Sequence, residues 1–178
     1  MAAVAVTAVL GAALATGAGA SVTAAKTISN EKYAKQLCGR LQDYLAEVDA
    51  LKEPDVSDPA AYQTQTLASV DKLTAQLKAA QTKLKKVSPE DGGKKITKLF
   101  DKYLADLQKE FQSARDTFAA ADPTSPAFSG AVTVLGVSLS TSNVKVGDPF
   151  SKLSDNQDLL GALGDEKSCE DIVTVIGG

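Results

Sequence analysis

Residues 96–121 read ITKLFDKYLADLQKEFQSARDTFAAA and decide the predicted fold. Apolar residues recur along this stretch at alternating steps of four and three, which places them on one stripe of an α-helix. The stripe consists of Ile96, Phe100, Tyr103, Leu107, Phe111, Ala114, Phe118 and Ala121. Lysines and acids occupy most positions between, so this amphipathic helix needs apolar partners to be stable in water.

Two earlier segments have the same period and supply those partners. The first is expected to begin at the N-cap Ser29 and to end before Pro54, because the residue before a proline avoids the α region. The second is expected to begin at Asp58-Pro59, a cap followed by a proline, and to run to Val87. The two stripes consist of Leu37, Leu41, Tyr44, Val48 and Leu51, and of Tyr62, Thr66, Val70, Leu73, Leu77, Ala80, Leu84 and Val87.

A further cap-then-proline signal stands in front of the third helix. It is the sequence SPED at residues 88–91, with Asp91 in the position of a capping-box acid. The glycine pair at 92–93 is expected to delay regular helix until about Lys94, and the Asp-Pro pair at 122–123 to end it. The three expected helices have about 24, 29 and 28 residues, which corresponds to roughly 36 to 43 Å. Their similar lengths and short connections predict an antiparallel up-down-up arrangement.

The region that follows, 126–145, has mixed signals. Its apolar residues keep helical spacing, but its glycines and β-branched residues would suit a strand equally well. A lone strand would lack a partner, so we expect a fourth helix through residue 139 that closes the bundle, then a loop or single turn over 142–153. A capping box at 154–157 predicts a short helix that Gly164 stops. The prediction is an all-α domain over 26–178, an up-down-up-down bundle of three to four long helices with a short C-terminal helix.

Residues 1–25 carry no charged side chain and are rich in alanine, valine and glycine. They predict a secretory leader, with cleavage after the small residues at 18–20. No lysine or arginine follows Met1, which departs from the usual leader pattern. The alternative is an uncleaved anchor, since about 20 apolar residues span a bilayer, and the small-residue end favours the leader.

Cys38 and Cys169 are the two cysteines of the chain. In an exported protein this even count predicts one disulfide, here between the first helix and the C-terminal tail. A bridge that closes so long a loop stabilises by at most about 5 kcal/mol in the chain-entropy model. Catalytic thiols normally lie close in sequence, so we expect a structural bridge; two free thiols are the alternative if the chain is not exported.

Composition excludes several classes of function. The net charge of −3 arises from 19 basic and 22 acidic residues spread over the same segments, and only Arg40 and Arg115 are arginine. A nucleic-acid binder would show a basic stripe rich in arginine or interleaved with aromatics. The chain has no histidine, which excludes Ser-His-Asp and Cys-His nucleophile systems, His-ligated zinc and the Glu-x-x-His sites of di-iron bundles. We expect no cofactor, no metal and no enzymatic activity.

Charged groups that resemble functional sites have simpler explanations. Asp101, Asp106 and Glu110 suggest an acid/base pair, yet they lie on the polar side of the third helix among lysines, where surface charge pairing explains them. The C-terminal third is acidic but has no D-x-[DN]-x-[DN]-G calcium loop, so a solvated face is expected. Its acids are Asp148, Asp155, Asp158, Asp165, Glu166, Glu170 and Asp171. The lysines that end the second helix, Lys83, Lys85 and Lys86, suit the negative end of its dipole; an acidic partner or anionic surface is the alternative.

The glycine-rich patches and the tyrosines also indicate no ligand site. The glycine-rich patches at 17–19 and 92–93 match neither dinucleotide nor P-loop spacing. The four tyrosines would suit a ligand pocket, but at these helical positions core packing is the better explanation. They are Tyr33, Tyr44, Tyr62 and Tyr103.

An alanine-rich leader, lysine-rich helices and the late motifs Lys152-Leu153-Ser154-Asp155 and Ser168-Cys169 occur together in this chain. In this combination the sequence resembles small secreted helical proteins of actinobacteria. The resemblance covers most of the mature chain and implies export and a helical bundle. It brings no catalytic residues and implies no function.

The sequence therefore predicts a non-catalytic, secreted or envelope-associated helical protein that acts through protein or surface contacts. Its partner would be a protein or a component of the cell envelope, with no nucleic acid, and with membrane attachment only through an uncleaved leader. We expect a monomer. The alternative is a bundle that holds an apolar small ligand or lipid in its core, because alanine and glycine can leave gaps between helices.

Overall fold

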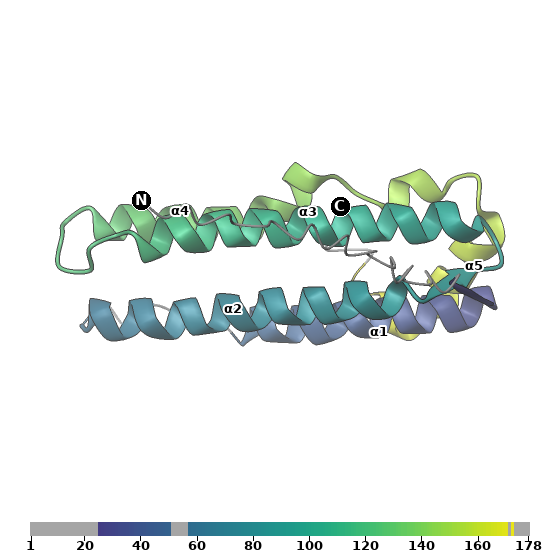
Figure 1. The fold of residues 1–178 in the computed structure, drawn as a ribbon, viewed down its shortest axis with the longest axis horizontal. Coiled ribbons are helices and arrows are strands. Elements are labelled where there is room, and N and C mark those ends of the chain that lie inside the picture. Colours follow the sequence, from purple (N-terminus) through teal and green to yellow (C-terminus); the bar gives the residue numbers. More distant parts are fainter. Residues whose placement is uncertain (1–24, 51–56, 171, 173–178) are drawn as a thin grey trace, which may run out of the picture.

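The fold is known from a computed structural model, which describes residues 25–50, 57–170 and 172. Four long helices lie side by side along the molecule (Figure 1). They are α1 Asn30–Asp49, α2 Pro59–Leu84, α3 Gly93–Ala119 and α4 Phe128–Val146. Two three-residue strands, β1 Lys26–Ile28 and β2 Val87–Pro89, precede α1 and α3, and the 3-10 helices η1 Phe150–Leu153 and η2 Lys167–Cys169 flank α5 Gln157–Asp165. The predicted all-α class is confirmed, and the predicted leader lies outside the described residues.

Both predicted helix starts before α1 and α2 are confirmed. The Ser29 hydroxyl accepts a hydrogen bond from the Lys32 backbone N–H at 3.5 Å, and the Asp58 carboxylate accepts one from Ala61 at 3.0 Å. These side chains satisfy N–H groups that the first turn of a helix leaves without a partner. α1, α2 and α3 have 20, 26 and 27 residues, each shorter than expected. The predicted end of the first helix, near Pro54, lies outside the described residues.

The connection between α2 and α3 was predicted wrongly. α2 ends at Leu84, and Val87–Pro89 forms β2, which pairs in parallel with β1 in the register Lys26 to Val87 and Ile28 to Pro89. Ser88 does not cap α3, because its side chain is buried and its hydroxyl accepts a hydrogen bond from the Thr97 hydroxyl at 3.2 Å. Three residues are too few to show a periodic pattern, so the strand has no signal in the sequence.

The acid that was expected to cap α3 holds α5 instead. One oxygen of Asp91 accepts a hydrogen bond from the Asn156 side chain at 3.0 Å, and the other accepts one from the Leu159 N–H at 3.3 Å. Asn156 is the N-cap residue of α5 but makes no capping bond with its own side chain, contrary to the predicted capping box. An acid distant in sequence therefore satisfies the first turn of α5, which also runs one residue past the predicted stop at Gly164.

The fourth segment is a helix, as predicted, but it is longer. α4 continues to Val146, into the stretch that was expected to be a loop, and stops before Gly147, which has a left-handed φ of 87°. The Asp148 carboxylate then accepts hydrogen bonds from the N–H groups of Phe150 and Ser151, which begins η1. No glycine or proline interrupts residues 137–146, so the earlier end that we predicted had no physical basis.

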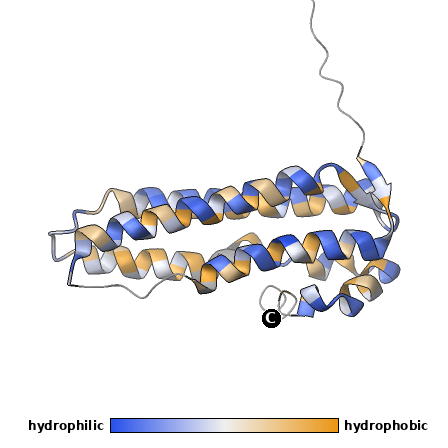
Figure 2. Ribbon diagram, turned by 90° about the horizontal axis from the view of Figure 1, so that it is seen from below, coloured by the Kyte–Doolittle hydropathy of each residue, from blue (hydrophilic) through white to orange (hydrophobic). Residues whose placement is uncertain are grey.

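The predicted stripe of 96–121 forms the centre of two buried clusters. The larger joins α1, α2 and α3 with η1, α5 and η2, and the smaller joins α2, α3 and α4. Phe100 contacts Phe150 in the larger cluster, with ring centroids 5.4 Å apart, and Phe118 contacts Phe128 in the smaller, at 5.5 Å. Figure 2 shows hydrophobic and hydrophilic positions alternating along these helices. Each large side chain buried in this way contributes roughly 1.5 to 3 kcal/mol before ordering costs.

Three of the four tyrosines lie deep in this core, as predicted from their helical positions. Tyr33, Tyr44 and Tyr103 are each at most 3% exposed, and burial disfavours the phenolate and raises the pKa of each phenol. The Tyr33 hydroxyl has no hydrogen-bond partner among the described residues. The nearby Thr97 side chain offsets part of the rise that burial causes in the pKa of Tyr33.

We expect these tyrosines to ionise only as the protein unfolds. A folded-state pKa above the usual value of about 10 means that the neutral phenol stabilises the fold, fully below about pH 10 and progressively less as the pH rises beyond it. Phenolate absorbance and circular dichroism followed together through an alkaline titration test this. Reversible ionisation of all four tyrosines near pH 10 with unchanged helicity would contradict it.

Candidate functional site

Exposed lysines gather at the end of the molecule where β1 pairs with β2. They come from β1, from the end of α2 and from the first three turns of α3. We call them the lysine end: Lys26, Lys83, Lys85, Lys86, Lys94, Lys95, Lys98 and Lys102. The predicted trio at the end of the second helix is therefore part of a larger group.

Backbone contacts bring these segments together. The Lys26 N–H donates to the Lys86 carbonyl at 2.8 Å, which fixes β1 beside the last turn of α2. The Thr97 hydroxyl donates to the Val87 carbonyl at 3.0 Å, which packs the start of α3 on β2. The turn between them requires Gly92, whose φ is 72° and where a Cβ would lie 2.5 Å from the Ile96 side chain. A residue with a side chain would be strained there, so the sharp return of the chain depends on glycine.

Most of the lysine end carries uncompensated positive charge. Lys85 pairs with Asp101 at 3.0 Å and Lys102 pairs with Asp106. Within the described ranges the other six lysines make no ion pair. Glu90 is the exposed acid of the β2–α3 turn, while Asp91 is engaged with α5. The exposed acids of the neighbouring segments are Glu31, Glu90, Asp155 and Asp158, so the six unpaired lysines leave a small local excess of positive charge on a chain whose net charge is −3.

Helix stability explains the lysines of α2 but not those of α3. Lys83 lies in the last turn of α2, where a cation complements the negative end of the helix dipole. Lys94 and Lys95 lie in the first turn of α3, which has no acid, and the N-cap Gly92 makes no side-chain capping bond. A cation at this positive end is unfavourable by up to about 0.3 to 1 kcal/mol. The helix dipole therefore does not account for these two lysines.

The carboxylates considered as an acid/base pair have other roles. Asp101 accepts a hydrogen bond from the Gln81 side chain at 2.6 Å in addition to its pair with Lys85, and Asp106 pairs with Lys102. The predicted pairing within the helix, at i, i+3 or i, i+4, is confirmed for Asp106, whereas Asp101 pairs with Lys85 from outside α3. No group of three or more metal-ligating side chains occurs in the part of the chain that the structure describes.

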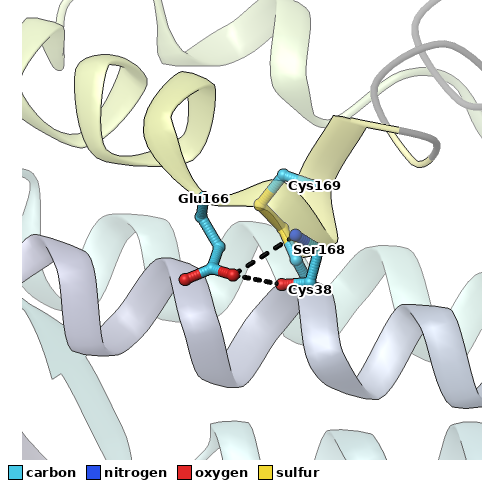
Figure 3. Close-up of a disulfide and its surroundings, with 4 residues drawn as sticks. All are labelled: Cys38, Glu166, Ser168 and Cys169. Atoms are coloured by element: carbon cyan, nitrogen blue, oxygen red, sulfur yellow. Dashed lines mark hydrogen bonds between the residues drawn. A yellow bond between two sulfur atoms is a disulfide. The ribbon is translucent and has the colours of Figure 1, made fainter.

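A disulfide joins Cys38 of α1 to Cys169 of η2, as predicted (Figure 3). Both cysteines are at most 1% exposed. Beside them the Glu166 carboxylate accepts hydrogen bonds from the hydroxyl of Ser168 at 2.8 Å and from its N–H at 3.2 Å, and these bonds lower the pKa of Glu166. The bridge and this turn hold the C-terminal segment on α1, which is a structural role.

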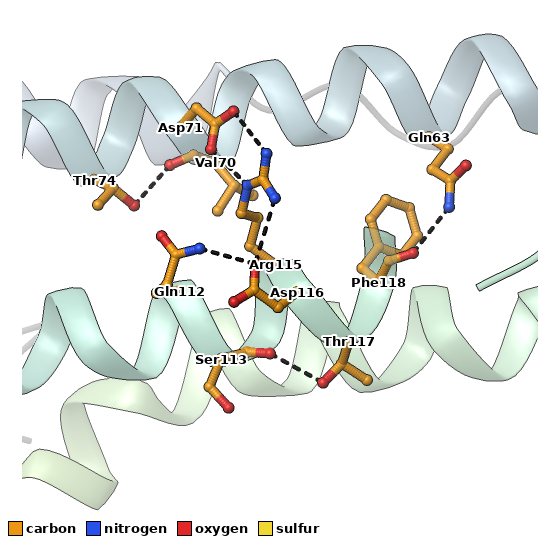
Figure 4. A network of polar contacts seen from close by, with 10 residues as sticks. All are labelled: Gln63, Val70, Asp71, Thr74, Gln112, Ser113, Arg115, Asp116, Thr117 and Phe118. Atoms are coloured by element: carbon orange, nitrogen blue, oxygen red, sulfur yellow. Dashed lines mark hydrogen bonds and ion pairs between the residues drawn. The ribbon is translucent and has the colours of Figure 1, made fainter. Parts of the chain in front are cut away.

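Both arginines are paired with acids of the fold, and Arg40 lines a hollow together with Lys83 of the lysine end. Figure 4 shows Arg115 of α3 making a two-point contact with Asp71 of α2, at 2.7 and 3.2 Å, which lowers the pKa of Asp71. Arg115 also approaches Asp116 at 3.4 Å, and Arg40 pairs with Asp43 at 3.5 Å. The guanidinium groups therefore serve contacts within the fold, and the unpaired cations of the lysine end are ammonium groups.

The larger group was missed because its two halves were considered separately. Lys83, Lys85 and Lys86 were noted at the end of one helix, and Lys94, Lys95 and Lys98 begin the next helix eight to twelve residues after Lys86. Their shared sign across a short glycine-containing turn was an available signal. No family model, curated protein or solved structure matches the chain, so the functional conclusion rests on the lysine end itself.

Proposed function

We propose that this chain is a non-catalytic, secreted or envelope-associated helical protein that attaches to an anionic component of the cell envelope through its lysine end. The observation that carries the proposal is the first turn of α3, where Lys94 and Lys95 are exposed, have no acid in the same turn and oppose the helix dipole. Opposite charge on a partner would turn this unfavourable placement into binding energy.

The lack of histidine and the pairing of the cysteines and of two carboxylates support a role without catalysis. The sequence has no histidine, the two cysteines are joined, and Asp101 and Asp106 are paired with lysines. Three tyrosines are neutral and buried in the core. Contact surfaces, by comparison, are extensive, because every long helix except α4 has a charged outer face.

Export is supported by the disulfide, since such bonds persist in oxidising compartments. The described helices include none long and apolar enough to cross a bilayer. We further infer an up-down-up-down bundle. It is supported by contacts between the start of α2 and the end of α3, at Gln63 and Phe118, and between the end of α2 and the first half of α3, at Gln81 and Asp101. We propose that this bundle is monomeric.

The alternative, an apolar ligand in the core, has less support. The glycines that would leave gaps between helices, Gly130, Gly136, Gly161 and Gly164, are exposed and face open space. A hollow of about 300 Å³ lies between α1 and α2, but four of its lining residues are charged: Arg40, Asp43, Glu47 and Lys83. Neither feature suits a lipid.

Replacing Lys94, Lys95 and Lys98 together by glutamine is expected to weaken binding to envelope fragments of the producing organism on the order of a hundredfold, since each lysine near an anionic surface contributes about 1 kcal/mol. Cosedimentation at increasing salt concentration measures this. The matched control replaces Lys78, Lys109 and Lys167, which are exposed elsewhere and remove the same charge. Equal loss in both variants, or binding that salt does not weaken, would refute the proposed function.

A further inference from the structure

The lysine end continues as a ridge along α3. Lys94, Lys98 and Lys102 follow at steps of four residues, so they share one face of the helix and extend over about 12 Å. Lys85, the residue that follows α2, lies beside this face, because it pairs with Asp101 at 3.0 Å. We call these four residues the lysine ridge.

From this geometry we infer that the anionic partner is a flexible linear polymer with repeating phosphate groups and not a bilayer surface; the inference rests on the proposed function. A membrane seated on the end of the bundle attracts charges within about one Debye length, roughly 8 Å. Lys102 lies beyond that distance from Lys94 along the helix. A flexible chain can follow the ridge from its first lysine to its last.

The surface around the ridge also lacks groups that insert into a bilayer. The chain has no tryptophan, and its five phenylalanines are all buried. The exposed large hydrophobic residues of the described chain are Val134 and Val137, 51% and 53% exposed, and both lie on α4. Helices that bind membrane surfaces combine basic residues with an inserted apolar face, and α3 directs its apolar face into the core.

The use of lysine alone suits phosphate. An ammonium group is a compact charge with three donors on a flexible stem, so it binds phosphate oxygens from any direction. Arginine would provide a fixed fork that matches a carboxylate or a phosphate group, but Arg115 is engaged with Asp71 and Arg40 lies beside Asp43. Repeated phosphates along a chain would release counterions from the partner as each ammonium binds.

The acids on α3 divide the lysines into two kinds. Lys94, Lys95 and Lys98 have no ion pair within the described ranges, so each gains a full contact with a phosphate. Lys85 and Lys102 must first break their ion pairs with Asp101 and Asp106 before they can contact the polymer. The first kind therefore contributes more to binding than the second, and removal of either acid strengthens binding.

Long-chain polyphosphate is the probe, bound to fluorescently labelled, disulfide-intact mature protein over a series of salt concentrations. The variant with Lys94, Lys95 and Lys98 replaced by glutamine should lose on the order of a hundredfold in affinity, and its salt slope should fall by about 0.7 to 0.9 for each lysine. Lys85→Gln with Lys102→Gln should lose less than tenfold, and the control at Lys78, Lys109 and Lys167 little. Asp101→Asn should bind several-fold more tightly, a gain that misfolding cannot produce.

The competing partners are tested in parallel. Vesicles of phosphatidylcholine with phosphatidylglycerol, or polyglutamate, binding as tightly as polyphosphate would overturn the inference, and so would unchanged affinity of Asp101→Asn. If envelope fragments bind through the lysine end but polyphosphate does not, this inference fails and the proposed function stands. If neither binds, both fail.

Discussion

Replacing Cys38 and Cys169 together by alanine is expected to lower the free energy of unfolding by about 2 to 5 kcal/mol. The bridge joins residues 131 positions apart, so it restricts most of the unfolded chain, and the chain-entropy model gives its largest effect for such long loops. Both sulfurs are buried, so the variant also loses packing between α1 and η2. Urea denaturation followed by circular dichroism measures the difference.

The loss of stability should be greatest in the C-terminal segment, which contains α5 and η2. α5 and η2 pack on α1, and Leu159, Leu163 and Ile172 contribute to the larger core cluster. Without the bridge, these few apolar residues and the two hydrogen bonds to Asp91 oppose the conformational entropy of the segment. Hydrogen exchange should therefore accelerate in α5 and η2 before it does in α2 and α3. Titration of two reactive thiols in the unfolded, unreduced native sequence would contradict the bridge, and with it the main support for export.

The parts of the fold that the sequence predicted correctly are those with local causes. Ser29 and Asp58 cap helices through the N–H groups three residues ahead, and the stripe of α3 repeats over its whole length. The parts that failed depend on distant partners. β2 exists because β1, about sixty residues earlier in the chain, lies beside it, and Asp91 bonds to Asn156, 65 residues later. Neither partner could be found from residues near the segment itself.

The candidate site could not be predicted for the same reason, because it depends on residues from separate segments. The dipole of α2 gave a sufficient local reason for Lys83, so nothing in that segment pointed to a ligand. The lysines become informative only when the turn at Gly92 brings α3 back beside α2, because Lys94 and Lys95 then add charge where the helix itself disfavours it. A left-handed glycine in a turn is predictable, but the side chains that the turn brings together are not.

Phe100→Ala is expected to lower the free energy of unfolding by about 3 to 5 kcal/mol, which is at the upper end for a single substitution. The Phe100 side chain is fully buried and contacts two other elements: Tyr33 of α1 at 6.5 Å between ring centroids and Phe150 of η1 at 5.4 Å. A cavity costs most where its walls cannot collapse, and here η1 is held by Asp148 on one side while α1 is tied by Cys38 on the other.

The matched control is Leu99→Ala, the neighbouring residue, which is half-buried and packs only against the edge of the cluster. It keeps the same helix and removes fewer buried atoms, so it should cost clearly less than Phe100→Ala. Chemical denaturation of both variants beside the native protein gives the comparison. Equal costs, or a loss below about 1 kcal/mol for Phe100→Ala, would mean that the core relaxes around the missing ring and that η1 is not fixed against α3.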